Sequence, residues 1–191
     1  MMYPRLLMDH SQLIKNCLKG KRLAQQELYN QFAAQMLGVC YRYTKNLDDA
    51  EDVLQDGFMK VYNNLQQFKG EGDLGGWIRR IMVNTALTYL RIHTRYRNQM
   101  DFEHMPLHPV VEEQATMNLQ TAALIEIIRK LPSGYQTIFN LVAIEGYNHI
   151  EVAALLNINE NTSRSQYSRA RAMLIREIEA ADQSRSKQQC I

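Results

Sequence analysis

Apolar residues recur every three or four positions along most of the chain. This spacing runs through 22–44, returns over 50–68 after a turn at 46–49, and predicts one amphipathic helix in each segment. A shorter helix is expected before Gly20, and another is expected to begin at Trp77. No stretch of useful length alternates apolar and polar residues as a half-buried strand does. The pattern predicts an all-α protein.

The periodicity fails over 98–115, where Pro106 and Pro109 also interrupt the chain. Apolar helical spacing resumes over 116–131, stops at Pro132 and continues toward Gly146. The sequence therefore predicts two small helical domains, 1–97 and 116–181, joined by a flexible linker. A frayed polar tail is expected over 182–191.

A helix-turn-helix is expected within the second domain. Asn148 followed by Glu151 predicts an N-cap, and Asn157 suits the left-handed residue that ends a helix tightly. The second helix is then expected after Asn159. Its apolar stripe is expected to comprise Ser163, Tyr167, Ala170, Leu174 and Ile178, with Ser163 an unusually polar member.

The opposite face of that second helix combines cations with small hydroxyls. Such side chains suit phosphates and base edges in a DNA major groove. The candidate residues are Arg164, Ser165, Ser168, Arg169 and, at the edge of the face, Arg171. Arg169 is expected to make a base or mixed contact and Arg171 a backbone contact. A solvated surface helix would explain an isolated basic helix equally well, but the preceding helix and turn favour DNA binding.

Charge is segregated along the chain although the net charge is only +2. Residues 48–56 contain five acids and no base, whereas 74–100 contain five arginines and no acid. Asp48 and Asp49 can be explained by the dipole at a helix start. Asp52 and Asp56 lie beyond the first turn, as in a docking surface for a basic protein.

Four glycines within 70–76 predict a flexible loop, without the Lys-Ser/Thr ending of a phosphate-binding loop. Trp77 follows, on a helix that carries both aromatic and basic residues and also Asn84. This combination suits single-stranded nucleic acid. Trp77 alone would be interpreted as a core residue, and both interpretations stay open.

Motifs for catalysis, metal binding and membrane insertion are missing from the sequence. It has no G-x-S-x-G, H-E-x-x-H or P-loop, and no apolar run near the roughly 18 residues of a membrane span. Pro106 separates His104 from His108, so no helix can align them on a metal. We expect a cytoplasmic protein that is not an enzyme and needs no cofactor or metal. Three dispersed cysteines are expected to be packing residues or a free tail thiol: Cys17, Cys40 and Cys190.

Motifs from both domains occur in an order and spacing that resemble bacterial RNA polymerase sigma factors of the extracytoplasmic-function (ECF) type. The first domain matches through Leu28-Tyr29, Phe32, the block 49–56, Phe58, 68–70, Trp77-Ile78, Arg80-Ile81, Asn84 and Leu90-Arg91. The second matches through Leu131-Pro132, Tyr135, Phe139, Leu141, 151–153, Leu156, Asn161-Thr162, 168–171 and Leu174. The departures are Ser163 for valine or isoleucine, Asn157 for glycine, and Gln166 and Tyr167 for arginine and leucine.

The resemblance implies three binding surfaces. Residues implied in docking on the basic clamp helices of core RNA polymerase are Asp49, Glu51, Asp52, Gln55 and Asp56. Residues implied in capturing the melted non-template strand of the minus-ten promoter element are Lys69, Trp77, Arg80, Asn84, Tyr89 and Arg91. The arginine and serine face of the second domain would read the minus-thirty-five element in duplex promoter DNA.

Two functions other than that of a sigma factor are alternative interpretations of this sequence. A dimeric helix-turn-helix regulator would act without polymerase and would not need the acidic face. A protein that only sequesters polymerase would not use the groove-facing arginines. Many relatives are controlled by a membrane-anchored anti-sigma factor. The resemblance therefore implies such a partner for this chain as well, although no residue of the sequence requires one.

Overall fold

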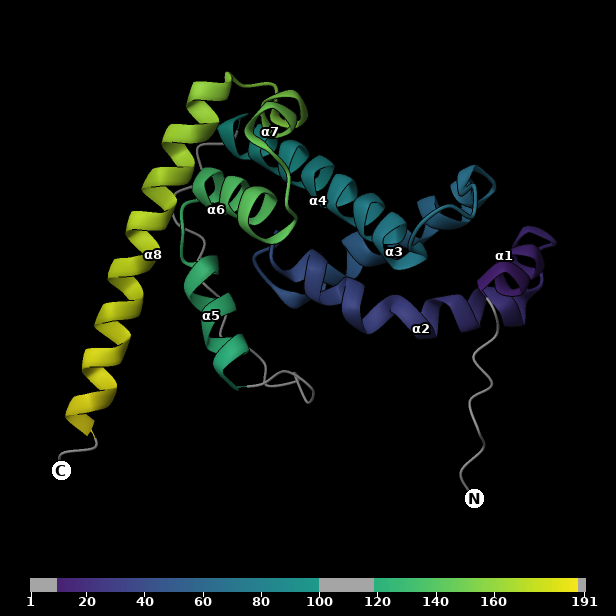
Figure 1. The fold of residues 1–191 in the computed structure, drawn as a ribbon, viewed down its shortest axis with the longest axis horizontal. Coiled ribbons are helices and arrows are strands. Elements are labelled where there is room, and N and C mark those ends of the chain that lie inside the picture. Colours follow the sequence, from purple (N-terminus) through teal and green to yellow (C-terminus); the bar gives the residue numbers. More distant parts are fainter. Residues whose placement is uncertain (1–9, 100–118, 189–191) are drawn as a thin grey trace. The chain divides into compact units, whose positions relative to one another are not determined.

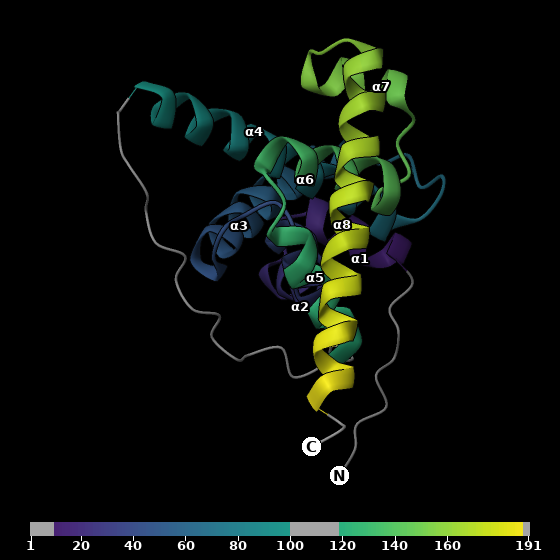
Figure 2. The ribbon, with the colours of Figure 1, turned by 90° about the vertical axis from the view of Figure 1, so that its left-hand side faces the viewer.

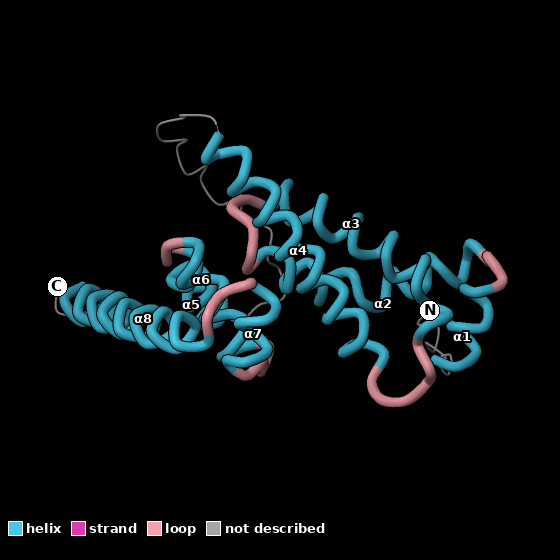
Figure 3. The backbone as a smooth tube through the Cα atoms, turned by 90° about the horizontal axis from the view of Figure 1, so that it is seen from above, coloured by secondary structure: helices cyan, strands magenta, loops and turns pink. Residues whose placement is uncertain are grey.

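The computed structural model describes residues 10–99 and 119–188, and every regular element in these two ranges is a helix (Figures 1 and 3). The fold class is therefore all-α, as predicted. The chain divides into two compact units, 1–110 and 111–191. The predictions for His104, His108 and Cys190, and for almost all of the linker, lie outside the described residues.

The first unit is a group of packed helices. In chain order they are α1 (His10–Leu18), α2 (Arg22–Tyr41), α3 (Leu47–Asn64) with a 3₁₀ turn η1 (Leu65–Gln67), and α4 (Leu74–Gln99). Helices α2, α3 and α4 pack on one another, and α1 packs on α2. The apolar stripe predicted over 22–44 is buried: Leu28, Phe32, Met36, Val39, Cys40 and Tyr43. Tyr43 lies in the turn after α2, which ends at Tyr41 and is therefore shorter than the predicted helix.

Two helix starts in this unit are earlier than the apolar pattern suggested. Helix α3 begins at Leu47 because the Asn46 side chain accepts a 2.7 Å hydrogen bond from the Asp49 N–H. Helix α4 begins at Leu74 and not at Trp77, since Asp73 Oδ2 accepts from the Gly76 N–H at 2.7 Å. The predicted glycine loop is correspondingly shorter.

The second unit contains α5 (Leu119–Arg129), α6 (Ser133–Phe139), the π-helical turn η2 (Asn140–Ile144), α7 (His149–Leu156) and α8 (Glu160–Gln188). Helices α5, α6 and α7 all pack on α8, which Figure 2 shows as one long uninterrupted helix. Its core includes Ile128, Leu131, Ala170 and Leu174. The backbone of the predicted polar tail is helical as far as Gln188.

Candidate functional site

Local capping fixes the geometry of the helix-turn-helix formed by α7 and α8. Asn148 Oδ1 accepts from the Glu151 N–H at 2.9 Å, and Glu151 Oε2 accepts from the Asn148 N–H at 2.8 Å. Asn157 ends α7 in the left-handed conformation, with φ 54° and ψ 50°. These observations confirm the predicted N-cap and helix stop. Helix α8 starts at Glu160, as expected from the position of Asn159.

The contact between α7 and α8 includes a polar pair that the sequence did not reveal. Ser163 is fully buried, and its Oγ lies 2.9 Å from Nδ1 of His149. The His149 ring also meets the edge of Tyr167 at 5.6 Å, and Phe139 stacks on Tyr167 at 6.0 Å. A buried serine needs a hydrogen-bond partner. Ser163, as a polar residue in the apolar stripe of α8, was therefore the signal in the sequence for a buried hydrogen bond. Spacing alone could not identify His149 as its partner.

The five predicted DNA-binding residues of α8 are all exposed: Arg164, Ser165, Ser168, Arg169 and Arg171. Arg164 pairs with Glu160 at 2.6 Å, and the Arg171 guanidinium lies 6.0 Å from the centre of the Tyr167 ring. The predicted buried stripe on the other side extends only to Leu174. Ile178 is 37% exposed, so its assignment to that stripe is wrong.

An acidic face lies beyond the first turn of α3, and we define it as three exposed acids and one exposed amide: Glu51, Asp52, Asp56 and Gln55. These positions fall within two turns of one helix, so their side chains lie close together. Asp49, one turn earlier, is half-buried and interacts with the Tyr89 hydroxyl. Burial, then the hydrogen bond with Asp49 and the charges of Asp49 and Asp52, raise the pKa of Tyr89.

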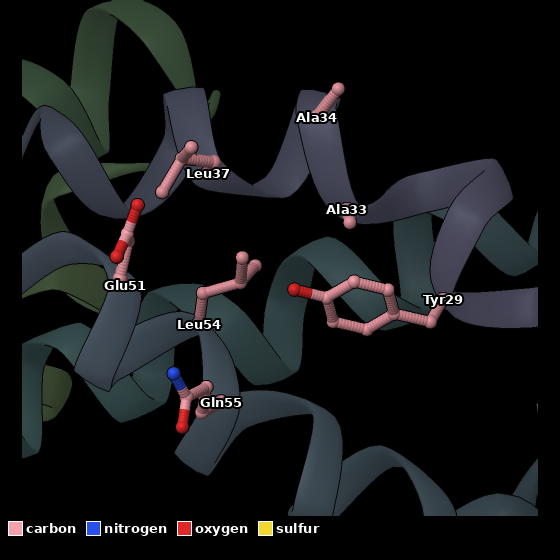
Figure 4. A pocket seen from close by; sticks show the side chains of 7 residues that line it. All are labelled: Tyr29, Ala33, Ala34, Leu37, Glu51, Leu54 and Gln55. Atoms are coloured by element: carbon pink, nitrogen blue, oxygen red, sulfur yellow. The ribbon is translucent and has the colours of Figure 1, made fainter. Parts of the chain in front are cut away.

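A shallow hollow of about 290 Å³ adjoins the acidic face, between α2 and α3 (Figure 4). Glu51 and Gln55 contribute the charged and amide groups of its α3 side, and Tyr29 extends its ring from α2 toward Leu54. The remaining lining residues are Ala33, Ala34 and Leu37. The sequence prediction missed the α2 side of this surface, because small residues within an amphipathic helix do not by themselves indicate a hollow.

Four of the predicted minus-ten residues share one face of α4. Trp77, Arg80, Asn84 and Arg91 follow one another at intervals of three, four and seven residues, which is helical spacing. Arg80, Asn84 and Arg91 are exposed, while Trp77 is half-buried against Phe68 with their ring centres 5.6 Å apart. Tyr89 lies off this face, toward Asp49 on α3.

Lys69 is exposed in the loop that precedes α4. Gly70 and Gly72 beside it have φ values of 76° and 87°, which other residues adopt with strain. These two glycines therefore shape the loop, whereas Gly75 and Gly76 belong to the first turn of α4. Lys69 is separated from Trp77 by this turn-rich segment and does not share the regular spacing of the α4 residues.

A helix-turn-helix with an exposed basic face, in a chain that also carries a separate acidic face, defines a DNA-binding protein with a protein-docking surface. The family model for sigma-70 region 2 matches residues 28–96, and that for sigma-70 region 4 matches residues 121–174. The chain belongs to the sigma-70 family of RNA polymerase sigma factors, and its relatives place it in the ECF type.

Two curated relatives illustrate this similarity. The chain is 26% identical over 178 residues to the ECF RNA polymerase sigma-E factor of Haemophilus influenzae, covering 87% of this chain and 94% of that protein. It is 30% identical over 152 residues to the ECF RNA polymerase sigma factor SigE of Mycolicibacterium smegmatis, covering 78% of this chain and 59% of that protein.

A solved structure agrees with the fold. The sigma factor RpoE from Bartonella quintana, crystallised in complex with the anti-sigma factor NepR, matches with a TM-score of 0.53 and 21% identity. The match covers 81% of this chain and 96% of that one.

Membership of this family identifies the chain as a transcription initiation factor, which binds core RNA polymerase and directs it to promoters, and not as an enzyme. Within residues 10–99 and 119–188, no helix combines the length and apolar character needed to cross a membrane. The same described residues contain no group of three or more His, Cys, Asp or Glu side chains suited to a metal ion.

Proposed function

We propose that this sigma factor uses three separate surfaces: the acidic face of α3 for polymerase, the shared face of α4 for the melted minus-ten strand, and the exposed face of α8 for the minus-thirty-five element. The observation that carries the proposal is that one chain presents an exposed acidic helix and an exposed basic helix-turn-helix. A sigma factor needs both, because it must hold polymerase and DNA at once.

The acidic face would dock on the basic clamp helices of polymerase. Opposite charges steer two proteins together and fix their register. The hollow beside Glu51 and Gln55 adds an apolar floor, from Leu54 and Leu37, into which an apolar side chain of the partner would insert. A partner side chain that fills such a hollow becomes desolvated, and contacts of that kind commonly provide much of the affinity of an interface. Asp49 would act less directly, since it is half-buried beside Tyr89.

The shared face of α4 would hold the single strand that melting releases. Arg80 and Arg91 would follow its phosphates, and Asn84 lies between them with its amide free to contact a base edge. Trp77 has one side against Phe68, so only its remaining surface could stack on a base. Lys69 would add a phosphate contact from the loop, and Tyr89 would support the helix from the α3 side.

The exposed face of α8 would enter the major groove of the minus-thirty-five element. In a helix-turn-helix the N-terminal residues of the second helix reach the base edges. Arg164, Ser165, Ser168 and Arg169 lie within the first three turns of α8 and are exposed. Arg171, drawn toward the Tyr167 ring, would contact the backbone at the rim of the groove.

We further propose that the protein acts in the cytoplasm and is held inactive by an anti-sigma factor. The support is the fold shared with an RpoE that was crystallised with its anti-sigma factor. The acidic face and its hollow would be an effective target, because covering them would prevent polymerase docking.

Titration with core polymerase tests the proposal. Labelled protein is mixed with core polymerase, and the complex is offered a genomic fragment library. We expect saturable binding, and retention of a small set of fragments that neither component retains alone. If the isolated chain selects the same fragments without polymerase, it is a conventional helix-turn-helix regulator and the proposal fails.

A further inference from the structure

Glu160, the first residue of α8, holds the side chain of Arg164. Its Oε1 accepts one hydrogen bond from Arg164 Nε at 2.9 Å and one from Nη2 at 2.6 Å. The pair is exposed, with 61% of the Arg164 side chain and 37% of the Glu160 side chain accessible. The acid precedes the base by four residues, which is the favourable order on a helix.

We infer that Glu160 is a specificity-determining residue that positions Arg164 for guanine. The inference rests on the proposed role of α8 in reading the minus-thirty-five element. A guanidinium has five N–H donors, and Glu160 engages the one on Nε and one on Nη2. Of the three that remain, one on Nη1 and one on Nη2 lie side by side along the terminal edge of the group, and the third points back toward Cδ.

That terminal edge matches guanine. In the major groove, guanine presents O6 and N7 as two neighbouring acceptors, and arginine recognises them with two parallel hydrogen bonds. Because Glu160 occupies the lateral edge, Arg164 can offer only its terminal edge to the DNA. The acid also repels phosphates, so it disfavours the competing backbone contact that carries no sequence information.

The other two arginines of the face lack such a neighbour. Arg169 has Ser165 and Met173 one turn away on either side, and Arg171 has Tyr167 and Ile175. Among the three, only Arg164 therefore has an acid within reach along the helix. An exposed pair contributes little to stability, so the effect of Glu160 is expected in base selection.

Substitution in the full chain, assembled with core polymerase, tests this inference. Initiation is measured on promoters whose minus-thirty-five element is randomised, and the preference at each position is scored. Glu160→Ala is expected to reduce a guanine preference at one position about three- to tenfold, part of what a complete bidentate contact provides. Glu160→Gln, which keeps the acceptor oxygen but removes the charge, is expected to retain more of that preference while binding non-promoter DNA more tightly.

Arg164→Ala identifies the position concerned. In that background, Glu160→Ala is expected to cause no further change there, because the two residues act as a unit. Glu179→Ala is the matched control, since it removes another exposed acid from the same helix and is expected to leave every preference unchanged.

The outcomes separate the inference from the proposed function. If Arg164→Ala relaxes one position and Glu160→Ala leaves it unchanged, the inference is wrong and the role of α8 stands. If Glu160→Ala weakens all positions equally and lowers helix content, Glu160 only stabilises the helix start and the inference is again wrong. If the wild-type complex has no upstream preference at all, the proposed role of α8 fails and the inference fails with it.

Discussion

Ser163 is a fully buried polar side chain that meets His149 across the helix-turn-helix. Their Oγ and Nδ1 atoms lie 2.9 Å apart, so each satisfies a group that burial would otherwise leave without a partner. Ser163 departs from the valine or isoleucine of the family pattern, and a buried hydroxyl without a partner would make the domain less stable. The partner provided by His149 offsets that cost, and it could not be predicted because it depends on how the two helices cross.

The Ser163 and His149 pair is expected to couple energetically. Ser163→Ala should destabilise the helix-turn-helix by about 1 kcal/mol, because His149 loses its hydrogen-bond partner. The double variant with His149→Ala should cost less than the sum of the two single changes. Amide hydrogen exchange over 149–174 measures this local stability. Ser168→Ala, at an exposed position, is the control, and strict additivity in the cycle would contradict the pairing.

Cys40 gives the first unit a pH-dependent stability. Burial raises the pKa of its thiol to about 12, well above that of a thiol in the unfolded chain. The unfolded chain therefore loses this proton first as the pH rises above about 9, and stability falls from there toward pH 12, by up to about 1.4 kcal/mol per pH unit. Urea unfolding monitored by Trp77, the single tryptophan, measures the slope.

Cys40→Ala should flatten that slope between pH 9 and 10, although it lowers stability overall by leaving a small cavity. Burial also raises the pKa of Tyr62, to about 12, so Tyr62 contributes to the slope above pH 10. An unchanged slope between pH 9 and 10 in the Cys40 variant would show that the thiol is not the responsible group.

At the scale of the elements, helix ends are set by single polar side chains. The apolar spacing predicted where the helices lie, including the buried stripe of α2, and the pair Asn148 and Glu151 predicted the cap of α7. It failed at the start of α4, where Asp73 captures a backbone N–H and draws Leu74 into the helix. It also failed toward the end of α8, whose polar residues suggested fraying although its backbone is helical through Gln188.

The left-handed turn after α7 provides a test at this scale. Asn157→Gly should stabilise the helix-turn-helix slightly, because glycine adopts a φ of 54° without strain. Asn157→Ala should destabilise it by about 1 kcal/mol, since alanine keeps the unfavourable Cβ but lacks the polar side chain by which asparagine tolerates this conformation. Hydrogen exchange of α7 and the start of α8 reports both effects. Equal stability of the two variants would contradict the backbone conformation at Asn157.

Surfaces formed by charged residues of a single helix were predictable from the sequence. Surfaces formed by two packed helices were not. The exposed acids of α3 and arginines of α8 could be placed from the sequence. The hollow that Tyr29 and Leu37 form with Glu51 could not, because it depends on the packing of α2 against α3. The same limitation applies to Tyr89, which the sequence grouped with Asn84 but which faces Asp49.

Reversing the charge of the acidic face should weaken polymerase binding. Asp52 and Asp56 are exposed, so changing both to Lys should leave the helix content intact while reducing affinity for core polymerase by several kcal/mol. A binding titration checks the affinity, and circular dichroism checks the fold. The control changes Glu177 and Glu179 to Lys, which alters the net charge equally on another helix. Equal affinities of the two double variants would refute this docking assignment.

The shared face of α4 is expected to act during promoter melting. Asn84→Ala should reduce open-complex formation more than closed-complex binding, because Asn84 is exposed and would contact only the released strand. Trp77→Ala should show the same loss together with some destabilisation, since the half-buried ring of Trp77 contacts the ring of Phe68. Permanganate footprinting beside thermal melts distinguishes the two effects. Normal melting of promoter DNA by the Asn84 variant would remove this face from the proposal.

The most direct measurement is run-off transcription with purified core polymerase and a genomic fragment library. Adding this protein should convert unselective core enzyme into one that starts at defined sites, and those start sites should share upstream elements near minus ten and minus thirty-five. The Asp52 and Asp56 reversal should abolish that activity, while Glu177 and Glu179 reversal should leave it. Transcription that remains unselective when the wild-type protein saturates the core enzyme would contradict the assignment as a promoter-specificity factor.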